Sequence, residues 1–243
     1  MSDSIYESTY IADGEYRELF QRTRQYQKLL DRILARIRAS VNLESLCADS
    51  SQDICWLLGI ERVAIYKFNE DWSGSFVNNF GFARTPWNDI RAFGQNLIWE
   101  DTHLQKAQGG RYVNNEPYCV IDVYEKGYPR CYIEVLEQFQ IRAYAIAPIF
   151  TGAKLWGLLA AYQHSQPRHW LADEVEFLHQ AGSYLGIAMQ QAETFTQAEQ
   201  QAKNLKNSVH RQRALMEVVG NIRSSLDTKF IFDTTCKELC KLL

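Results

Sequence analysis

Apolar residues in the first forty positions recur every three or four residues, which is the spacing of one buried face of an α-helix. This stripe consists of Tyr16, Leu19, Phe20, Tyr26, Leu29, Leu30, Ile33, Leu34 and Ile37. Upstream of it, residues 1–14 are rich in Ser, Asp and Tyr and carry no such stripe. We therefore expect a flexible lead over residues 1–14 and a helix from Glu15.

Two further segments have helical spacing. Asn42 offers an N-cap to the segment LESLCADSSQDICWLL, and Gly59 is the residue type that commonly ends a helix. From Leu171 the helical spacing continues for roughly fifty residues without a proline. Its apolar positions include Leu185, Ala188, Ala192, Phe195, Ala198, Ala202, Leu205 and Val209. A helix this long is typical of a coiled coil or a connector, and a long solvated helix is the alternative. Because Glu199 and Lys206 interrupt the Ala-rich seam, pairing between two such helices is expected to be weak.

The remaining regular segments alternate in the way of β-strands. Ile60–Phe68 places Val63 and Ile65 on one face and Arg62, Ala64 and Tyr66 on the other. The turn NEDWSG leads to SFVNNF, which is expected to pair back on it. IRAYAIAPIF and KLWGLLAAYQ are joined by the hairpin signal Thr151-Gly152-Ala153. Strands with helices before, between and after them predict an α+β fold, with an antiparallel sheet flanked by helices and a long C-terminal connector helix.

Composition excludes several classes of function. The net charge is -3, and the sequence has no basic patch or basic tail. We therefore expect neither nucleic acid nor a membrane surface as a partner. No apolar run is long enough to span a bilayer, and the polar N-terminus lacks the layout of a signal peptide, so a cytoplasmic protein is expected. The six cysteines and five histidines form no metal motif, and no nucleophile elbow or P-loop is present. We therefore do not expect an enzyme. His164 and His169 flank Pro167 and are expected to be solvated.

The stretch from Trp99 to Tyr144 is the most unusual part of the chain. It is rich in loops and aromatic residues, and Cys131 stands at the start of the short helical segment CYIEVLEQFQ. Rings and a thiol beside a helix are consistent with a pocket for a flat conjugated ligand. The alternative is a loop over a hydrophobic core with a buried structural cysteine.

This stretch resembles the bilin-binding GAF domain of cyanobacteriochromes, the photoreceptor relatives of phytochromes. The matching motifs are Trp-Glu-Asp-Thr from Trp99, Gly-Gly-Arg-Tyr from Gly109, and Cys131 opening its helix. They continue through RAYAIAPIF, LWGLLAAYQ and the upstream RVAIYKFNEDWSGSFV. The resemblance covers roughly residues 25–192. It implies a GAF fold and a covalently bound linear tetrapyrrole.

The resemblance also implies a role for each candidate site residue. Cys131 would form a thioether with ring A, and Asp101 would accept hydrogen bonds from the pyrrole N–H groups. Arg111 would bind a propionate, because its planar fork matches a carboxylate. The aromatic pocket residues would be Trp99, Tyr112, Tyr132, Tyr128 and Tyr162. From the residues alone, Asp101 could instead cap the helix that follows, Arg111 could be a solvated charge, and Tyr112 and Tyr162 could simply be core.

Three positions depart from the pattern of the family. Cys131 is followed by Tyr132 where many relatives of the red/green type have histidine, and Tyr128 also replaces a histidine. His103 stands where members with two cysteine linkages carry the second cysteine, so that linkage and its blue shift are not expected. The resemblance implies phycocyanobilin as the cofactor and a red-absorbing dark state, and Tyr132 leaves biliverdin as the alternative and green or far-red tuning open.

The end of the chain repeats its beginning at a shift of 185 residues. Ile37-Arg38-x-Ser40 corresponds to Ile222-Arg223-x-Ser225, and Cys55-x-Leu57-Leu58 to Cys240-x-Leu242-Leu243. We therefore predict a bilin-binding GAF domain over residues 15–192, a connector signalling helix over 193–211, and the start of a second, truncated GAF domain over 212–243. The chain is interpreted as part of a longer modular sensor.

The predicted function is a photoreceptor module that switches by isomerisation at ring D and signals to downstream domains of the same longer protein. A homodimer through the helices is an additional expectation. The alternatives are a GAF domain that binds a cyclic nucleotide or another small ligand, and a structural dimerisation module whose pocket is a filled core.

Overall fold

The computed structural model describes residues 3–39, 42–90, 93, 102–225 and 228–242. The chain divides into two compact units, Met1–Ala192 and Glu193–Leu243. The helices are α1 (Asp3–Ala39), α2 (Leu43–Leu57), α4 (Thr102–Lys106), α5 (Arg130–Gln138), α6 (Ala172–Ser225) and α7 (Thr228–Leu242), with short 3-10 turns η1 (Trp87–Asp89) and η2 (Gly110–Asn114). The strands are β1 (Arg62–Phe68), β2 (Gly74–Phe76), β3 (Phe82–Ala83), β4 (Tyr118–Val120), β5 (Ala143–Thr151) and β6 (Lys154–Gln163).

The first unit is built on one antiparallel six-stranded sheet. Its strand order is β2-β1-β6-β5-β4. The short strand β3 is not part of this order and pairs with Arg62 and Val63 at the start of β1. β1 pairs with β2 as expected, and β5 pairs with β6 through the hairpin at Gly152, whose φ of +59° suits glycine. The predicted α+β fold with an antiparallel sheet and a long C-terminal helix is therefore confirmed. β3 spans only two residues, which is too short for an alternation to predict it, whereas β4 lies in the alternating stretch PYCVIDVY.

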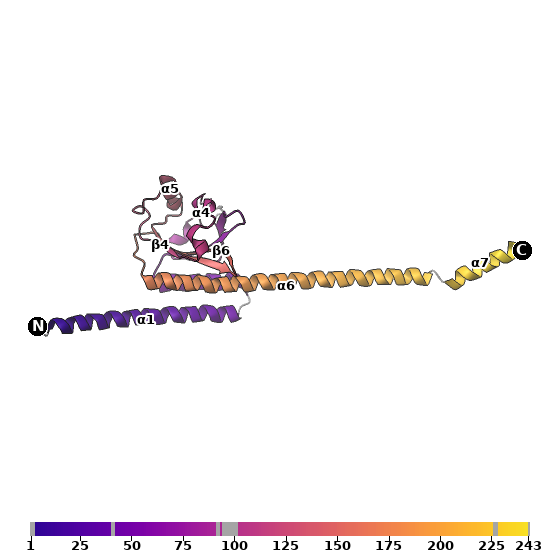
Figure 1. Ribbon diagram of the computed structural model, residues 1–243, viewed down its shortest axis with the longest axis horizontal. Coiled ribbons are helices and arrows are strands. Elements are labelled where there is room, and N and C mark those ends of the chain that lie inside the picture. The colour runs from indigo at the N-terminus through magenta and orange to yellow at the C-terminus, as the bar shows by residue number, and fades with distance from the viewer. Residues whose placement is uncertain (1–2, 40–41, 91–92, 94–101, 226–227, 243) are drawn as a thin grey trace. The chain divides into compact units, whose positions relative to one another are not determined.

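The sheet separates two hydrophobic clusters. Val63 and Ile65 of β1 face α1, α2 and the first part of α6, whereas Ala64 and Tyr66 of the same strand face α5 and the loops around it. Figure 1 shows α4 and α5 on the opposite side of the sheet from α1 and the first part of α6. The predicted division of β1 between two faces is confirmed, and α5 with its thiol lies over the second cluster.

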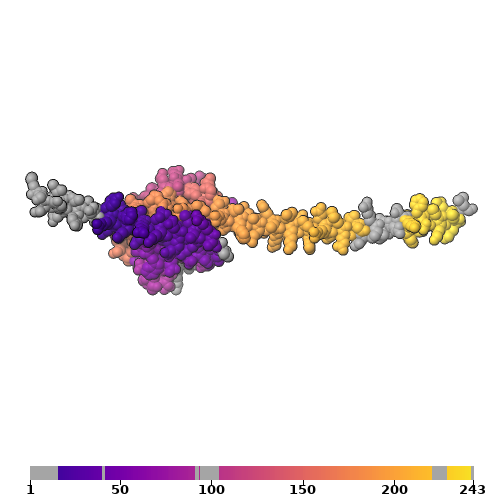
Figure 2. Space-filling view, turned by 90° about the horizontal axis from the view of Figure 1, so that it is seen from below, coloured from indigo at the N-terminus to yellow at the C-terminus, as the bar shows by residue number. Residues whose placement is uncertain are grey.

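The helices of the first cluster form where the apolar stripes predict them. Asn42 caps α2 by accepting hydrogen bonds from the backbone of Glu44 and Ser45. Tyr26 of α1 stacks on Phe177 of α6 at 4.8 Å between ring centroids, and Figure 2 shows α1 (indigo) against α6 (orange). α1 itself begins at Asp3, upstream of the expected start at Glu15. Only the later part of the stripe, from Tyr26 to Ile37, is buried, whereas Tyr16 and Phe20 are exposed. Residues 3–14 contain no proline that would end the helix.

The second unit contains the rest of α6, which runs on to Ser225, and α7. The large apolar side chains that the structure describes in this unit are exposed, among them Phe195 (65%), Leu205 (66%), Val209 (40%) and Met216 (66%). They therefore gain nothing from burial within the described chain. In the described residues, none of the helices has the length and apolar character needed to cross a bilayer.

Candidate functional site

Cys131 lies in the first turn of α5 and its side chain is exposed. Pro129 precedes the helix with extended backbone, and its carbonyl accepts hydrogen bonds from the backbone of Tyr132 (3.0 Å) and Ile133 (3.1 Å). These two bonds fix where the helix begins. The interpretation of Cys131 as a buried structural cysteine is therefore wrong, because α5 buries Leu136 and leaves the thiol on its outer side.

Three tyrosines form a connected group next to this thiol. The Tyr128 and Tyr132 rings meet edge to face at 4.9 Å, and the Tyr128 hydroxyl lies 2.6 Å from the hydroxyl of Tyr144 on β5. Burial raises the pKa of Tyr128 to about 12 and raises that of Tyr144 further, so both hydroxyls stay protonated at neutral pH. The hydroxyl pair therefore ties the loop in front of Cys131 to the sheet.

Arg111 lies on the neighbouring turn η2, where its side chain is exposed. Its guanidinium carbon is 3.8 Å from the centre of the Tyr118 ring on β4. The Lys126 ammonium approaches the same ring at 5.4 Å. Gly109 directly precedes the turn, has a φ of +85°, and is a position where a Cβ would lie 2.8 Å from Trp72. Arg111 is thus a stacked, solvent-accessible cation close to the tyrosines rather than an unattached loop charge.

The structure describes the side chains of only some of the other predicted residues. Tyr112 and Tyr162 are both buried in the second cluster. Trp99 and Asp101 lie outside the described residues, and so does the side chain of His103, whose backbone belongs to α4. The structure therefore brings Cys131, Tyr128, Tyr132 and Arg111 to one side of the sheet and leaves the predicted acid untested.

Sequence reasoning missed Tyr144 and Tyr118, which connect the predicted residues. Tyr144 pairs with Val120, and Tyr118 with Ile146, so the two tyrosines share a face of the β4–β5 ladder at 6.4 Å between ring centroids. The alternation in RAYAIAP carries the signal for Tyr144. The alternation in PYCVIDVY carries the corresponding signal for Tyr118.

The expectation that His164 is solvated is wrong. The imidazole is 7% exposed, its Nδ1 donates to the Gln140 carbonyl at 2.8 Å, and Trp87 stacks on it at 5.0 Å. Burial lowers the pKa of His164 to about 4. Pro167 suggested an open loop here. However, β6 continues to Gln163, so His164 lies at the end of the strand and contacts Gln140, which is distant in sequence.

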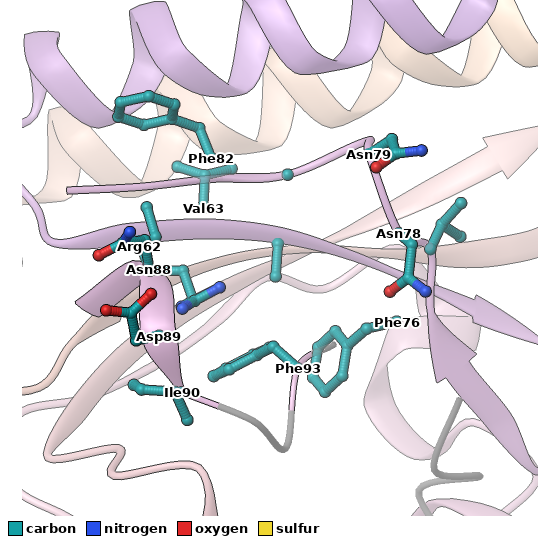
Figure 3. A pocket seen from close by; sticks show the side chains of 14 residues that line it. Arg62, Val63, Phe76, Asn78, Asn79, Phe82, Asn88, Asp89, Ile90 and Phe93 are labelled. Carbon is teal, nitrogen blue, oxygen red and sulfur yellow. The ribbon is translucent and has the colours of Figure 1, made fainter. Parts of the chain in front are cut away.

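A pocket of about 520 Å³ opens elsewhere in the same unit, against β1, β2, β3 and η1 (Figure 3). Its lining includes Arg62, Phe76, Asp89 and Phe93, and no predicted site residue among those described takes part in it. The guanidinium of Arg62 donates to the Trp87 carbonyl and lies 4.0 Å above the Phe93 ring. The pocket was not foreseen because its walls come from segments that only the sheet brings together.

Comparisons with known proteins agree with this architecture. The GAF domain family matches residues 42–189. The far-red-absorbing dark state of JSC1_58120g3 with bound biliverdin IXa is 40% identical, with a TM-score of 0.61, over 68% of this chain and 99% of that one. The red-absorbing state of NpR6012g4, a red/green cyanobacteriochrome, is 43% identical, with a TM-score of 0.58, over 64% of this chain and 98% of that one.

The chain is also similar to part of a longer protein, a putative methyl-accepting chemotaxis protein of Synechocystis, with 27% identity over 80% of this chain. The match spans only 19% of that protein's length. The chain therefore belongs to the GAF domain family, and GAF domains of cyanobacteriochromes are among its close structural matches.

Proposed function

We propose that residues 15–192 form a photosensory module that binds a linear tetrapyrrole covalently through Cys131. The observation that carries the proposal is the exposed thiol in the first turn of α5, beside the rings of Tyr128 and Tyr132. A buried cysteine such as Cys47, whose pKa burial raises to about 12, could not react with a ligand in this way. The bilin-binding relatives at 40–43% identity support the same assignment.

The described residues fit such a ligand in three respects. Flat side chains near Cys131 can pack on a conjugated system, and the exposed fork of Arg111 can bind a propionate carboxylate. The thiol adds across the ethylidene double bond of ring A, so that one S–C bond forms and the thiol proton ends on carbon without an oxidant. The bound tetrapyrrole would supply the light absorption and the isomerisation at ring D.

The remaining candidates keep the roles that the family implies. Asp101 would accept the pyrrole N–H groups, Trp99 would stack near ring D, and His103 would border the ring without forming a second linkage. Tyr112 and Tyr162 would form the buried wall of the chromophore pocket. We further propose phycocyanobilin as the chromophore, with biliverdin as the alternative that the replacement at Tyr132 leaves open, and a red-absorbing dark state.

We propose that the signal leaves along α6 to further domains of a longer protein. The match to the putative chemotaxis protein spans only 19% of that protein's length, which supports this organisation. The sequence repeat at a shift of 185 residues places the helical residues of α7 on those of α2, with Cys240 against Cys55. This agreement supports the proposal that residues 193–211 are a connector and that residues 212–243 begin a second GAF domain.

The decisive experiment is expression of the chain together with phycocyanobilin synthesis. We expect a red-absorbing band that photoconverts under red light and a pigment that stays bound in acid urea. Cys131→Ser should lose the covalently bound pigment entirely. Cys119→Ser removes a half-buried thiol from β4 and should keep it.

Other outcomes would change the assignment. Pigment that survives denaturation on the Cys131→Ser protein would exclude this cysteine as the anchor. A wild-type chain that stays colourless with phycocyanobilin and with biliverdin would contradict the photosensory function. It would favour a GAF domain that binds a small ligand non-covalently or one that only dimerises.

A further inference from the structure

Asp122 is a buried carboxylate that has no part in the proposed function so far. It follows β4, and its side chain is 3% exposed. One carboxylate oxygen accepts a hydrogen bond from the backbone N–H of Tyr124 at 3.0 Å, and the other accepts one from Nη2 of Arg142 at 2.5 Å. A buried carboxylate is costly unless it is paired and hydrogen-bonded in this way. The loop after β4 is therefore fixed to Arg142 through this side chain.

Arg142 is in turn fixed to the sheet. It directly precedes β5, and its backbone N–H donates to the carbonyl of Gln163 at the end of β6 at 2.9 Å. Its own carbonyl accepts from the backbone N–H of Val123 at 2.9 Å. Its guanidinium carbon lies 4.7 Å from the centre of the Tyr124 ring. The Tyr124 side chain is thus oriented by its contact with Arg142, although half of it is exposed.

Tyr124 extends this connection to the helix that carries the thiol. Its hydroxyl donates to Oε1 of Glu137 in the last turn of α5 at 3.1 Å. The structure describes all nine residues of this helix, and Leu136 is its only fully buried side chain. One buried side chain fixes the position of a short helix but restricts its rotation only weakly. The hydrogen bond between Tyr124 and Glu137 adds a second point of attachment.

Two connections to the start of β5 therefore flank Cys131. Before the thiol, the Tyr128 hydroxyl lies 2.6 Å from the hydroxyl of Tyr144. After the thiol, Glu137 is connected through the contacts above to Arg142, two residues before Tyr144 in the chain. The sulfur of Cys131 is exposed and takes part in neither connection. The arrangement restrains the helix on both sides of the thiol and leaves the thiol accessible.

We propose that Asp122 and Tyr124 are positioning residues for the covalent attachment of the tetrapyrrole to Cys131. This inference rests on the proposed function. Attachment forms one S–C bond to the ethylidene group of ring A and leaves the thiol proton on carbon, so the sulfur must reach one particular carbon of the bound ligand. A misplacement of about 1 Å can slow such a step by about a hundredfold. The connection through Tyr124 and Glu137 prevents α5 from rotating about Leu136 and misplacing the sulfur.

The test measures the rate of covalent attachment after phycocyanobilin is added to the unpigmented full chain. Asp122→Asn keeps the shape of the side chain but loses the charge that holds Arg142, and should slow attachment about tenfold. Tyr124→Phe keeps the ring and loses only the hydroxyl, and should slow attachment about threefold. The matched control Asp53→Asn breaks an ion pair of 2.8 Å with Arg36, between α2 and α1, and should keep the wild-type rate.

Two further measurements separate positioning from a role in folding. Non-covalent binding of phycocyanobilin to Cys131→Ser protein should be equally tight with and without Asp122→Asn, because only the attachment step depends on where the sulfur lies. Glu137→Gln keeps an acceptor for the Tyr124 hydroxyl and should attach pigment at the wild-type rate. Glu137→Ala should be as slow as Tyr124→Phe.

Wild-type attachment rates in both Asp122→Asn and Tyr124→Phe would overturn the inference and leave the photosensory function intact. An equal loss of attachment rate and of non-covalent binding in Asp122→Asn would overturn it as well, because the residue would then only support the fold. If Asp122→Asn does not fold, Tyr124→Phe and the two variants of Glu137 decide the question. A wild-type chain without covalent pigment would instead remove the proposed function, and this inference with it.

Discussion

His164 makes the stability of the first unit depend on pH. Its pKa is about 4 in the folded protein and 6.5 in an unfolded chain. Above pH 6.5 the imidazole is neutral in both states and costs nothing. As the pH falls below 6.5, the unfolded state takes up a proton first, so stability is lost progressively down to about pH 4. From pH 7.5 to pH 5 the loss due to this group is about 2 kcal/mol.

The measurement is urea unfolding of the first unit, followed at a series of pH values between 7.5 and 5. His164→Gln should be less stable at pH 7.5, because Gln lacks the stacking on Trp87, but should lose less on acidification. His169→Gln changes an exposed histidine and should keep the wild-type slope. Equal slopes for the wild type and His164→Gln would show that the imidazole is not buried as a neutral group.

At the scale of single residues, the sequence predicts which side chains belong to the candidate site better than it predicts what surrounds each side chain. Cys131, Tyr128, Tyr132 and Arg111 were predicted as neighbours because a family motif joins them, and the structure places them around α5 and β4. The burial of His164 depends on Gln140, a partner distant in sequence, which no local pattern encodes. The role of Asp101 stays a prediction.

At the scale of elements, the close contact between β1 and β6 depends on a glycine. A Cβ at Gly157 would lie 2.1 Å from the carbonyl oxygen of Tyr66, so backbone would have to move. We expect Gly157→Ala to lower the free energy of unfolding by about 2–3 kcal/mol. Gly220→Ala on α6 meets nothing within 4 Å and should slightly stabilise its helix. Thermal unfolding of both variants checks the contrast, and equal melting temperatures would contradict the packing of β6 on β1.

Strands β1 and β6 also show what the alternation of apolar residues can predict and what it cannot. Alternation in Ile60–Phe68 correctly separated Val63 and Ile65 from Ala64, because each face of the sheet is buried against a different layer. The same alternation says nothing of which strand lies beside which. The order β2-β1-β6-β5-β4, and with it the pocket beside Arg62, follows from pairings between residues a hundred positions apart.

At the scale of the whole molecule, the exposed face of α6 indicates a partner, and we propose a second copy of this chain. Phe195, Ala202, Val209 and Met216 recur every seven residues, and Ala198, Leu205 and Val219 fall on the alternating positions between them. A 3-4 spacing of this kind forms the seam of a coiled coil between two helices. Gln212 and the alanines make the seam weak, so association should be concentration-dependent.

Sedimentation over a range of concentrations tests this proposal. Two acidic residues in the seam, Leu205→Asp with Val209→Asp, should shift the chain to monomer, because burying two carboxylates per helix costs more than the seam gains. The matched control, Asn204→Asp with Asn207→Asp, adds the same charge on the outer face of the same turns and should leave the dimer intact. If both pairs of substitutions weaken association equally, net charge rather than the seam controls it. If the wild type sediments as a monomer throughout, α6 acts as a single connector and its apolar face has another partner.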